Sequence, residues 1–247
     1  MKIRNKKTGE IREFDCTLIN SSKLSAQNRQ RLYWCGKRNQ DGTYSRVDVE
    51  QPEDRGILLR DILLQESEVP DKYWYSCAWN YTGATSGDVV HLEIKGNEQL
   101  KRVYSEDYKS PTLTTCGGGN TEAKVLQNGK PRKLTPKEYM RLQTVPDSYV
   151  FPVSDTQAYK MLGNGWTVDV ISHILSYCPE ITTDPLDVLS MYDGMACGRL
   201  ALDKLGAHIF RYRATEIDKY AIKTACYNFP DIEYLGDAFL VRTANTL

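Results

Sequence analysis

The sequence is poor in the features that mark membrane, secreted and metal-bound proteins. No apolar run approaches the ~20 residues that a bilayer-spanning helix needs, and the polar start MKIRNKKTGE has no apolar stretch typical of a secretion signal. Its seven cysteines are odd in number and form no C-x-x-C pair, which argues against a zinc site and against disulfides. We therefore expect a cytoplasmic protein with reduced thiols, no metal and no membrane association.

A net charge is also lacking, but the charges are unevenly spread. Residues 1–50 carry 11 Lys and Arg against 6 Asp and Glu, and residues 101–150 carry 9 against 5. Residues 51–100 carry 4 against 9. Such blocks allow a positive face to meet phosphates, but the charge pattern by itself favours the alternative of ordinary solvated surface charge.

The C-terminal quarter has the pattern of a parallel α/β sheet. We expect strands at residues 187–191, 209–215 and 232–235, with helices at 198–206 and 217–227 between them. This β-α-β-α-β run is the beginning of a doubly wound sheet.

The remainder of the chain has fewer regular patterns. Two β-rich segments, residues 13–20 and 31–37, flank a polar loop, and residues 38–131 look irregular apart from a short helix at 56–63 and a strand that ends in a glycine turn at 110–120. Residues 134–147 begin as a helix with Thr135 as N-cap, Pro136 in the first turn and Glu138 closing a capping box. A second, amphipathic helix follows the Gly-Asn-Gly loop and places these apolar residues on one face: Val168, Ile171, Ile174 and Leu175.

Acidic residues and glycines fall at the predicted strand ends of the C-terminal sheet. Gly194 and Gly198 permit a close backbone approach to a ligand at a helix N-terminus. Glu216 suits ribose hydroxyls at the end of the next strand, and Asp237 can accept from an adenine amino group at the third. Asp193 places a negative charge at the position where NAD would place its own negative pyrophosphate. This disfavours NAD and favours a ligand with a cationic group such as a sulfonium. A generic α/β turn set with surface acids is the alternative.

Six stretches together resemble the cytosine-C5 DNA methyltransferases, especially short phage and bacterial forms. The stretches DVLSMYDGMACG, ATEID and LGDA resemble the family's three S-adenosylmethionine motifs. SAQNRQRLYW resembles the two-arginine motif near the flipped base, RKLTPKEYMRLQTVPD the motif that organises target recognition, and MLGNGWTVDVI the last motif, which packs against the cofactor. The resemblance implies a Rossmann-like class I methyltransferase sheet with a small target-recognition region.

The order and content of these motifs depart from the family pattern. The cofactor motif comes last and the GNGWTVDV motif precedes it, which indicates a circular permutation. The sequence contains neither the Pro-Cys pair of the family's nucleophile nor its Glu-Asn-Val motif, and it stops at Leu247, where the segment leading to them should start. We therefore expect central strands 4 and 5 of the sheet to be missing, and a second polypeptide to supply the catalytic Cys and Glu.

The resemblance assigns four regions: a catalytic-sheet part (1–37), a target-recognition region (38–131), scaffold and cofactor-side helices (132–181) and a cofactor-binding segment (186–247). It implies double-stranded DNA as substrate, S-adenosylmethionine as cofactor, and no activity of the isolated chain. Arg29 and Arg31 would lie beside the flipped cytosine. The implied cofactor residues are Asn164, Trp166, Tyr192, Asp193, Gly194, Met195, Ala196, Cys197, Gly198, Glu216, Ile217, Asp237 and Ala238. Core packing is the alternative for Trp166 and Tyr192, and a non-catalytic S-adenosylmethionine- or DNA-binding module is the alternative for the whole chain.

Overall fold

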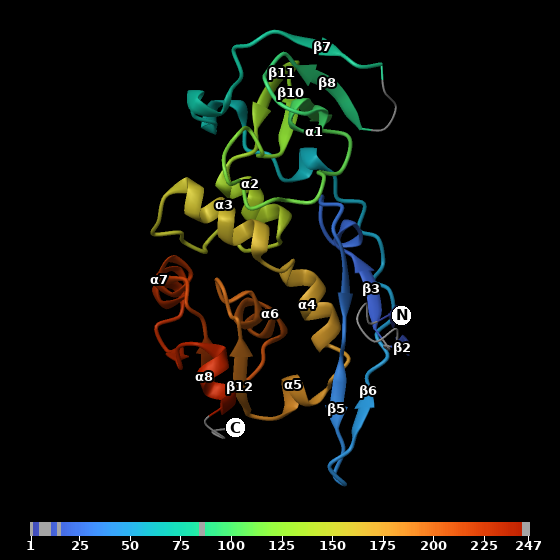
Figure 1. Ribbon diagram of the computed structural model, residues 1–247, viewed down its shortest axis with the longest axis vertical. Coiled ribbons are helices and arrows are strands. Elements are labelled where there is room, and N and C mark those ends of the chain that lie inside the picture. Colours follow the sequence, from blue (N-terminus) through green and yellow to red (C-terminus); the bar gives the residue numbers. More distant parts are fainter. Residues whose placement is uncertain (1, 5–10, 14–15, 84–86, 244–247) are drawn as a thin grey trace.

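Three groups of secondary structure follow one another along the long axis of the molecule (Figure 1). The computed structural model describes residues 2–4, 11–13, 16–83 and 87–243. A five-stranded sheet lies at one end, a three-stranded parallel sheet lies at the other, and helices connect them. Within these residues no helix has the length and apolarity to cross a membrane.

The parallel sheet of the C-terminal quarter has the predicted elements. Strands β12 (Leu186–Met191), β13 (Ile209–Thr215) and β14 (Glu233–Tyr234) pair in parallel in the order β12-β13-β14. Helices α6 (Cys197–Leu205) and α7 (Lys219–Asn228) connect them, and α8 (Ala238–Thr243) follows. The β-α-β-α-β prediction is therefore confirmed, which establishes an α/β fold for this part of the chain.

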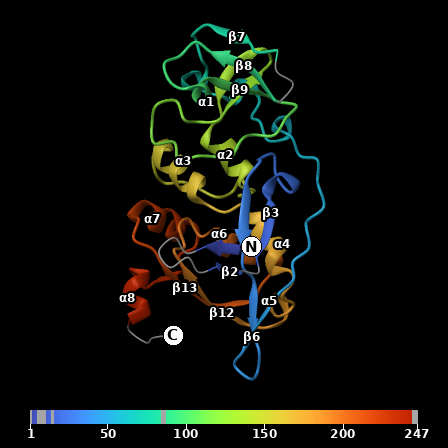
Figure 2. The same cartoon turned by 45° about the vertical axis from the view of Figure 1, so that its right-hand side comes forward.

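One edge of β12 carries no neighbouring strand among the described residues, since β12 pairs only with β13. The N-terminal strands β3 (Thr17–Asn20) and β4 (Gln30–Tyr33) form a separate antiparallel hairpin. These blue strands run alongside α4 in both views of the molecule (Figures 1 and 2). The parallel sheet and this hairpin are thus two separate sheets, which lie on either side of the central helices.

Residues 38–131 are more regular than the sequence predicts. Strands β7 (Trp79–Tyr81), β8 (Asp88–Leu92), β9 (Arg102–Ser105), β10 (Lys124–Gln127) and β11 (Lys130–Lys133) form one sheet in the order β11-β10-β9-β8-β7, with the short helix α1 (Glu98–Lys101) beside it. The irregular reading was wrong because strands of three to five residues are too short to show alternation.

Two local predictions in this region also fail. The helix expected over residues 56–63 is a single 3-10 turn, η2 (Leu59–Asp61), and the strand expected over 110–120 is an irregular segment that ends in the glycine turn. The segment 110–120 pairs instead through side chains and an isolated bridge between Gln27 and Ser110.

The connecting helices begin where their caps predict. In α2 (Pro136–Leu142) the Thr135 hydroxyl accepts from the Glu138 N–H, and the Glu138 carboxylate accepts from the Thr135 N–H at 2.7 Å. Helices α3 (Asp155–Asn164), α4 (Val168–Leu175) and α5 (Glu180–Thr183) follow. The apolar face of α4 is buried as expected, because α4 packs on α6 and against the N-terminal hairpin.

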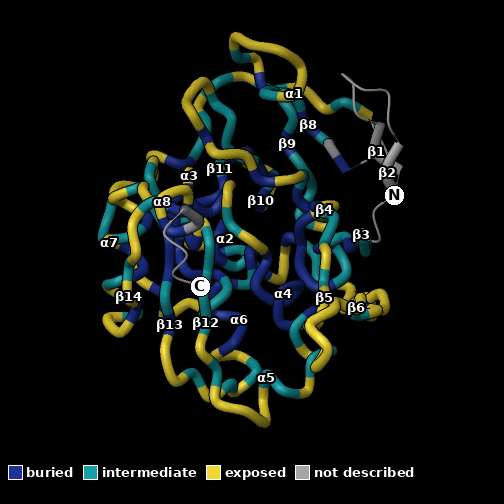
Figure 3. Tube along the Cα trace, turned by 60° about the horizontal axis from the view of Figure 1, so that its bottom comes forward, coloured by how far each residue is buried: buried dark blue, intermediate teal, exposed yellow. Residues whose placement is uncertain are grey.

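One hydrophobic core joins segments that are far apart in the sequence. It runs from Ile19 of β3 through α2, α3 and α4 to Ala201 of α6 (Figure 3). Smaller clusters lie under the parallel sheet and within the five-stranded sheet. The remaining elements have three residues each: β1 (Lys2–Arg4), β2 (Ile11–Glu13), η1 (Ser21–Lys23), β5 (Gly36–Arg38), β6 (Tyr44–Arg46), η3 (Glu66–Glu68) and η4 (Asp71–Tyr73).

Candidate functional site

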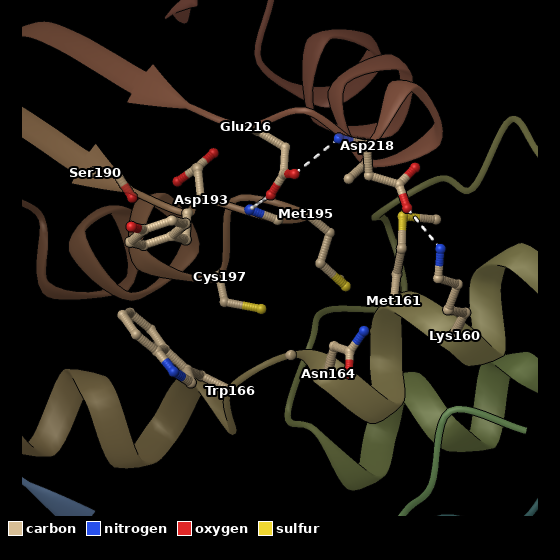
Figure 4. A pocket seen from close by; sticks show the side chains of 14 residues that line it. Lys160, Met161, Asn164, Trp166, Ser190, Asp193, Met195, Cys197, Glu216 and Asp218 are labelled. Carbon is tan, nitrogen blue, oxygen red and sulfur yellow. Dashed lines mark hydrogen bonds and ion pairs between the residues drawn. The ribbon is translucent and has the colours of Figure 1, made fainter. Parts of the chain in front are cut away.

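A cavity of about 320 Å³ lies at the carboxyl ends of β12 and β13, where α3 approaches α6 (Figure 4). Eight predicted cofactor residues line it: Asn164, Trp166, Tyr192, Asp193, Gly194, Met195, Cys197 and Glu216. Six further lining residues were not among the predicted cofactor residues: Lys160, Met161, Gly165, Ser190, Asp218 and Ala221. Four of them, Met161, Gly165, Ser190 and Asp218, lie within the motifs named above. Its volume is within the range of small-molecule sites.

The Glu216 carboxylate holds the loop after β12 in its conformation at the cavity. Tyr192, Gly194 and Ala196 have φ of 57°, 60° and 60°, so the chain turns through left-handed conformations before α6 starts. The Gly194 N–H donates to Glu216 Oε2 at 2.8 Å. Glu216 Oε1 accepts from the next two backbone N–H groups at 2.7 and 2.9 Å. Glu216 is therefore fixed in place at the strand end, with its carboxylate on the cavity wall.

Asp193 is a buried acid on the same wall. Its side chain is 8% exposed, and the Tyr212 hydroxyl donates to Oδ1 at 2.8 Å. Burial raises the pKa of Asp193, because the charged form loses its hydration. A cationic ligand group beside it would favour the ionised form.

The balance of charge around the cavity is negative. Asp193, Glu216 and Asp218 contribute carboxylates, and Lys160 is the one cation among the lining residues. The Lys160 ammonium already pairs with Asp218 at 2.8 Å. A pyrophosphate therefore finds few free positive charges here, in agreement with the argument against NAD.

Two aromatic rings stand open at the cavity. Trp166 is 49% exposed and Tyr192 is 57% exposed. Core packing, the alternative for both residues, is therefore wrong. Phe239 of α8 lies near the Tyr192 ring, with ring centroids 6.4 Å apart, and adds a third aromatic side chain close to this rim.

Five predicted cofactor residues do not line the cavity. Ala196 and Ala238 are buried, and Gly198 sits at the start of α6, where a Cβ would meet the Tyr212 hydroxyl at 3.4 Å. The side chain of Ile217 points to solvent, with 75% exposure. Asp237 caps α8 by accepting from the Phe239 N–H at 2.9 Å. The roles of these five residues stay predictions.

The two arginines of the N-terminal motif lie in different environments. Arg29 is 5% exposed and donates to the carbonyls of Leu113, Gly163 and Gly165 at 3.4, 3.1 and 3.1 Å. Its burial, and secondarily the charge of Arg31, lower its pKa. Arg31 is exposed and donates to its neighbour's carbonyl. Arg29 thus holds backbone segments together, while Arg31 is free to meet a ligand.

The cysteines offer no activated thiol at this site. Cys197 lines the cavity but is buried, and burial raises its pKa to about 12. Burial also raises the pKa of Cys116. Thiolates, not thiols, are the nucleophiles. Within the ranges that the structure describes, no group of three or more His, Cys, Asp or Glu residues is arranged to hold a metal ion.

A cavity at the carboxyl edge of a parallel sheet, closed by a strand–loop–helix turn and an acid after the next strand, defines an α/β protein with a nucleotide-type ligand site. The chain belongs to the C-5 cytosine-specific DNA methylase family, which it matches over residues 13–180. S-adenosylmethionine is the methyl donor of this family. The matched residues include Arg29, Arg31, Asn164 and Trp166 and end before β12.

Similar proteins are type II methyltransferases of bacteria. The chain is 32% identical to M.HpaII of Haemophilus parainfluenzae over 163 residues, which cover 59% of this chain and 44% of that protein. It is 34% identical to M.HhaI of Haemophilus parahaemolyticus over 155 residues, which cover 60% and 47%. The chain therefore spans about half the length of the curated relatives it matches. A solved methyltransferase of Entamoeba histolytica aligns with a TM-score of 0.45 at 14% identity, over 66% of this chain and 52% of that one.

Proposed function

We propose that this chain binds S-adenosylmethionine in the cavity between α3 and the β12 loop. The observation that carries the proposal is the lining itself: three carboxylates against one lysine, with two open aromatic rings. Carboxylates suit a ligand that carries a sulfonium and an ammonium group, and Glu216 suits ribose hydroxyls. The exposed faces of Trp166 and Tyr192 offer stacking surfaces for adenine.

We further propose that the chain is part of an enzyme that methylates C5 of a flipped cytosine in double-stranded DNA. The bound cofactor supplies an electrophilic methyl group. The chain's own residues hold the cofactor, and Arg31 offers permanent, planar donors to the cytosine O2 edge. The sheet β7–β11 and its loops would hold the duplex, at a cost of a few kcal/mol for extruding the base.

Methylation at C5 also needs a thiolate that adds to C6, because C5 alone is a poor nucleophile. Residues 1–247 contain no Pro-Cys pair, and Cys197 is buried with a pKa of about 12. We propose that a second polypeptide supplies the nucleophilic Cys and the partner Glu, in a permuted and split arrangement of the family's motifs.

The open edge of β12 supports this assembly. Every side chain of β12 is at least partly exposed, and Phe210 on the neighbouring strand is 75% exposed. Open strand edges are normally paired or covered. A partner that pairs here would form a core-like interface larger than the ~1,600 Å² of a standard complex.

The alternative is a non-catalytic module that binds S-adenosylmethionine or DNA. The observation in its favour is that two cysteines beside α3 are both buried. Cys116 lines a cavity at the start of α3, and Cys197 lines the cavity at its end. In that case no polypeptide would confer methyl transfer on the chain.

Two measurements test these proposals. Calorimetry of the purified chain with S-adenosylmethionine should show binding, and duplex DNA should receive labelled methyl groups only after a second polypeptide with Pro-Cys and Glu-Asn-Val motifs is added. Absence of cofactor binding would sink the first proposal. Methyl transfer by the lone chain would refute the split arrangement, and binding without transfer under any pairing would favour the alternative.

A further inference from the structure

An exposed glycine loop, residues 117–119, lies between the five-stranded sheet and α3. Gly117, Gly118 and Gly119 are exposed, and a Cβ added to any of them would meet no atom within 4 Å. Gly118, Gly119 and Asn120 have φ of 108°, 69° and 63°. The loop therefore presents its backbone to an approaching partner without side chains in the way.

The beginning of this segment is fastened to the N-terminal hairpin and to α3. Gln27 Oε1 accepts from the Leu113 N–H at 3.0 Å, and Arg29 donates to the Leu113 carbonyl. The Thr114 carbonyl oxygen lies so close to Gly163 of α3 that a Cβ there would come within 2.2 Å of it. The loop is thus fixed at its first end by backbone contacts with α3 and the N-terminal hairpin.

The other end is fastened by a buried cation. Lys124 begins β10, is 3% exposed, and donates from Nζ to the carbonyls of Asn120 and Glu122 at 2.7 and 2.9 Å. The carboxylate of Glu122, whose charge opposes the lowering of the Lys124 pKa by burial, pairs with Lys133 of β11 at 3.4 Å. Burying an ammonium whose partners are backbone carbonyls costs free energy. A lysine on the surface would avoid this cost if the strand had a structural role alone.

A cavity of about 460 Å³ lies beside this end of the loop. Polar side chains dominate its wall, among them Arg102, Thr112, Thr114, Asn120 and Thr121. Such a wall offers both donors and acceptors, as recognition of base edges requires. The cavity, the bare loop and its two anchors together form a preorganised recognition surface.

We propose that Lys124 is the positioning residue that holds the loop 117–122 in the conformation that reads the base sequence of double-stranded DNA. This inference rests on the proposed function, because it takes DNA as the substrate. Lys124 acts through the carbonyls of Asn120 and Glu122 and does not itself need to reach a base.

The charge of Lys124 gives this role a pH signature. Burial lowers its pKa to about 8, so the ammonium loses its proton, and with it the stronger charge-assisted hydrogen bonds, just above neutral pH. The facing groups are Glu122 and Cys116 of the loop, Lys133 of β11, Arg102 of β9 and Tyr139 of α2. Burial raises the pKa of Cys116 and Tyr139. Neither group therefore ionises in the pH range in which Lys124 loses its proton.

The test is selection from a randomised library of DNA duplexes by the whole chain at pH 7 and pH 9.5. The wild-type chain should enrich one DNA sequence at pH 7. Its preference for that sequence over unselected DNA should fall by about tenfold or more at pH 9.5, which is the effect of one mismatched base pair. Lys124→Met should show the low discrimination at both pH values and keep its affinity for unselected DNA within about threefold. Lys223→Met, an exposed lysine of α7 outside the five-stranded sheet, should behave as wild type.

Cofactor calorimetry on each variant separates the possible failures. Selective DNA binding that is unchanged in Lys124→Met, or flat with pH in wild type, would overturn this inference and leave the proposed function standing. A wild-type chain that binds the cofactor but no DNA sequence selectively would overturn both. If Lys124→Met loses cofactor binding and therefore does not fold, the wild-type pH profile decides alone.

Discussion

The guanidinium of Arg29 and the carbonyl oxygen of Gly165 lie 3.1 Å apart, and this hydrogen bond ties the N-terminal hairpin to the rim of the cavity between α3 and the β12 loop. The same side chain donates to Leu113 and Gly163. One buried cation therefore joins the hairpin to two segments that lie 84 and 134–136 residues further along the chain.

Replacing Arg29 with Met should lower the free energy of unfolding by roughly 2 kcal/mol or more, since each buried acceptor left without a donor costs about 1–3 kcal/mol. Urea unfolding followed by circular dichroism measures this. Arg31→Met is the matched control, because Arg31 is exposed and donates only to its neighbour's carbonyl. Equal stabilities of the two variants would show that Arg29 does not hold these segments together.

Gly163→Ala should destabilise the protein although it adds one methyl group. The new Cβ would lie 2.2 Å from the Thr114 carbonyl oxygen, and such overpacking costs about 1–3 kcal/mol. Thermal unfolding should show a lowered midpoint. Gly117→Ala has no atom within 4 Å of its Cβ and should unfold like wild type; a wild-type midpoint for Gly163→Ala would mean that the 110–116 segment moves freely from α3.

Glu216→Ala should weaken S-adenosylmethionine binding by about 1.5–3 kcal/mol, the contribution of a hydrogen bond to a charged group. The variant also frees the loop N–H of Gly194. Isothermal calorimetry gives the affinity directly. Glu233→Ala, on the same sheet but outside the cavity lining, is the control, and an unchanged affinity of Glu216→Ala would remove Glu216 from the site.

The stability difference between wild type and Lys124→Met should change with pH. The pKa of Lys124 falls from its ordinary value of 10.5 to about 8 in the folded chain, so the unfolded chain binds more protons between these two values. Wild-type stability relative to the variant therefore rises with pH from about 8 to 10.5, by up to roughly 3 kcal/mol. Denaturant unfolding at pH 7, 8.5 and 10 measures it, and a constant difference would show that Lys124 titrates normally.

Local chemistry made the C-terminal elements and α2 predictable. Gly206 ends α6 in a left-handed conformation, Asp218 caps α7, and Thr135 and Glu138 close the capping box of α2. Each of these signals depends on residues two to four positions apart. The Asn128-Gly129 turn between β10 and β11 is a local hairpin signal that the irregular interpretation of residues 38–131 missed. Strands β7, β8 and β9 gave no such signal, since longer loops separate them from their pairing partners.

The residues of the candidate site were likewise predictable only in part. The loop 192–198 and Glu216 were predictable because a strand–loop–helix pattern places them at one sheet edge, and the structure puts them at one cavity. Met161 and Asp218 lie within the motifs MLGNGWTVDVI and ATEID but were not predicted as cofactor residues, and Lys160 lies outside every motif. A charge pair between residues fifty-eight positions apart, Lys160 and Asp218, has no local pattern.

The sequence by itself determined the family, the order of its motifs and the α/β character of residues 186–247, because these depend on residue identity and on short-range periodicity. Only the tertiary structure decided that Arg29 is buried while Arg31 is exposed, and that Trp166 and Tyr192 line a cavity and do not fill a core. It also decided that Lys124 is a buried cation at the end of a bare glycine loop. Burial and charge pairing depend on which distant segments pack together, and a linear sequence does not contain those distances.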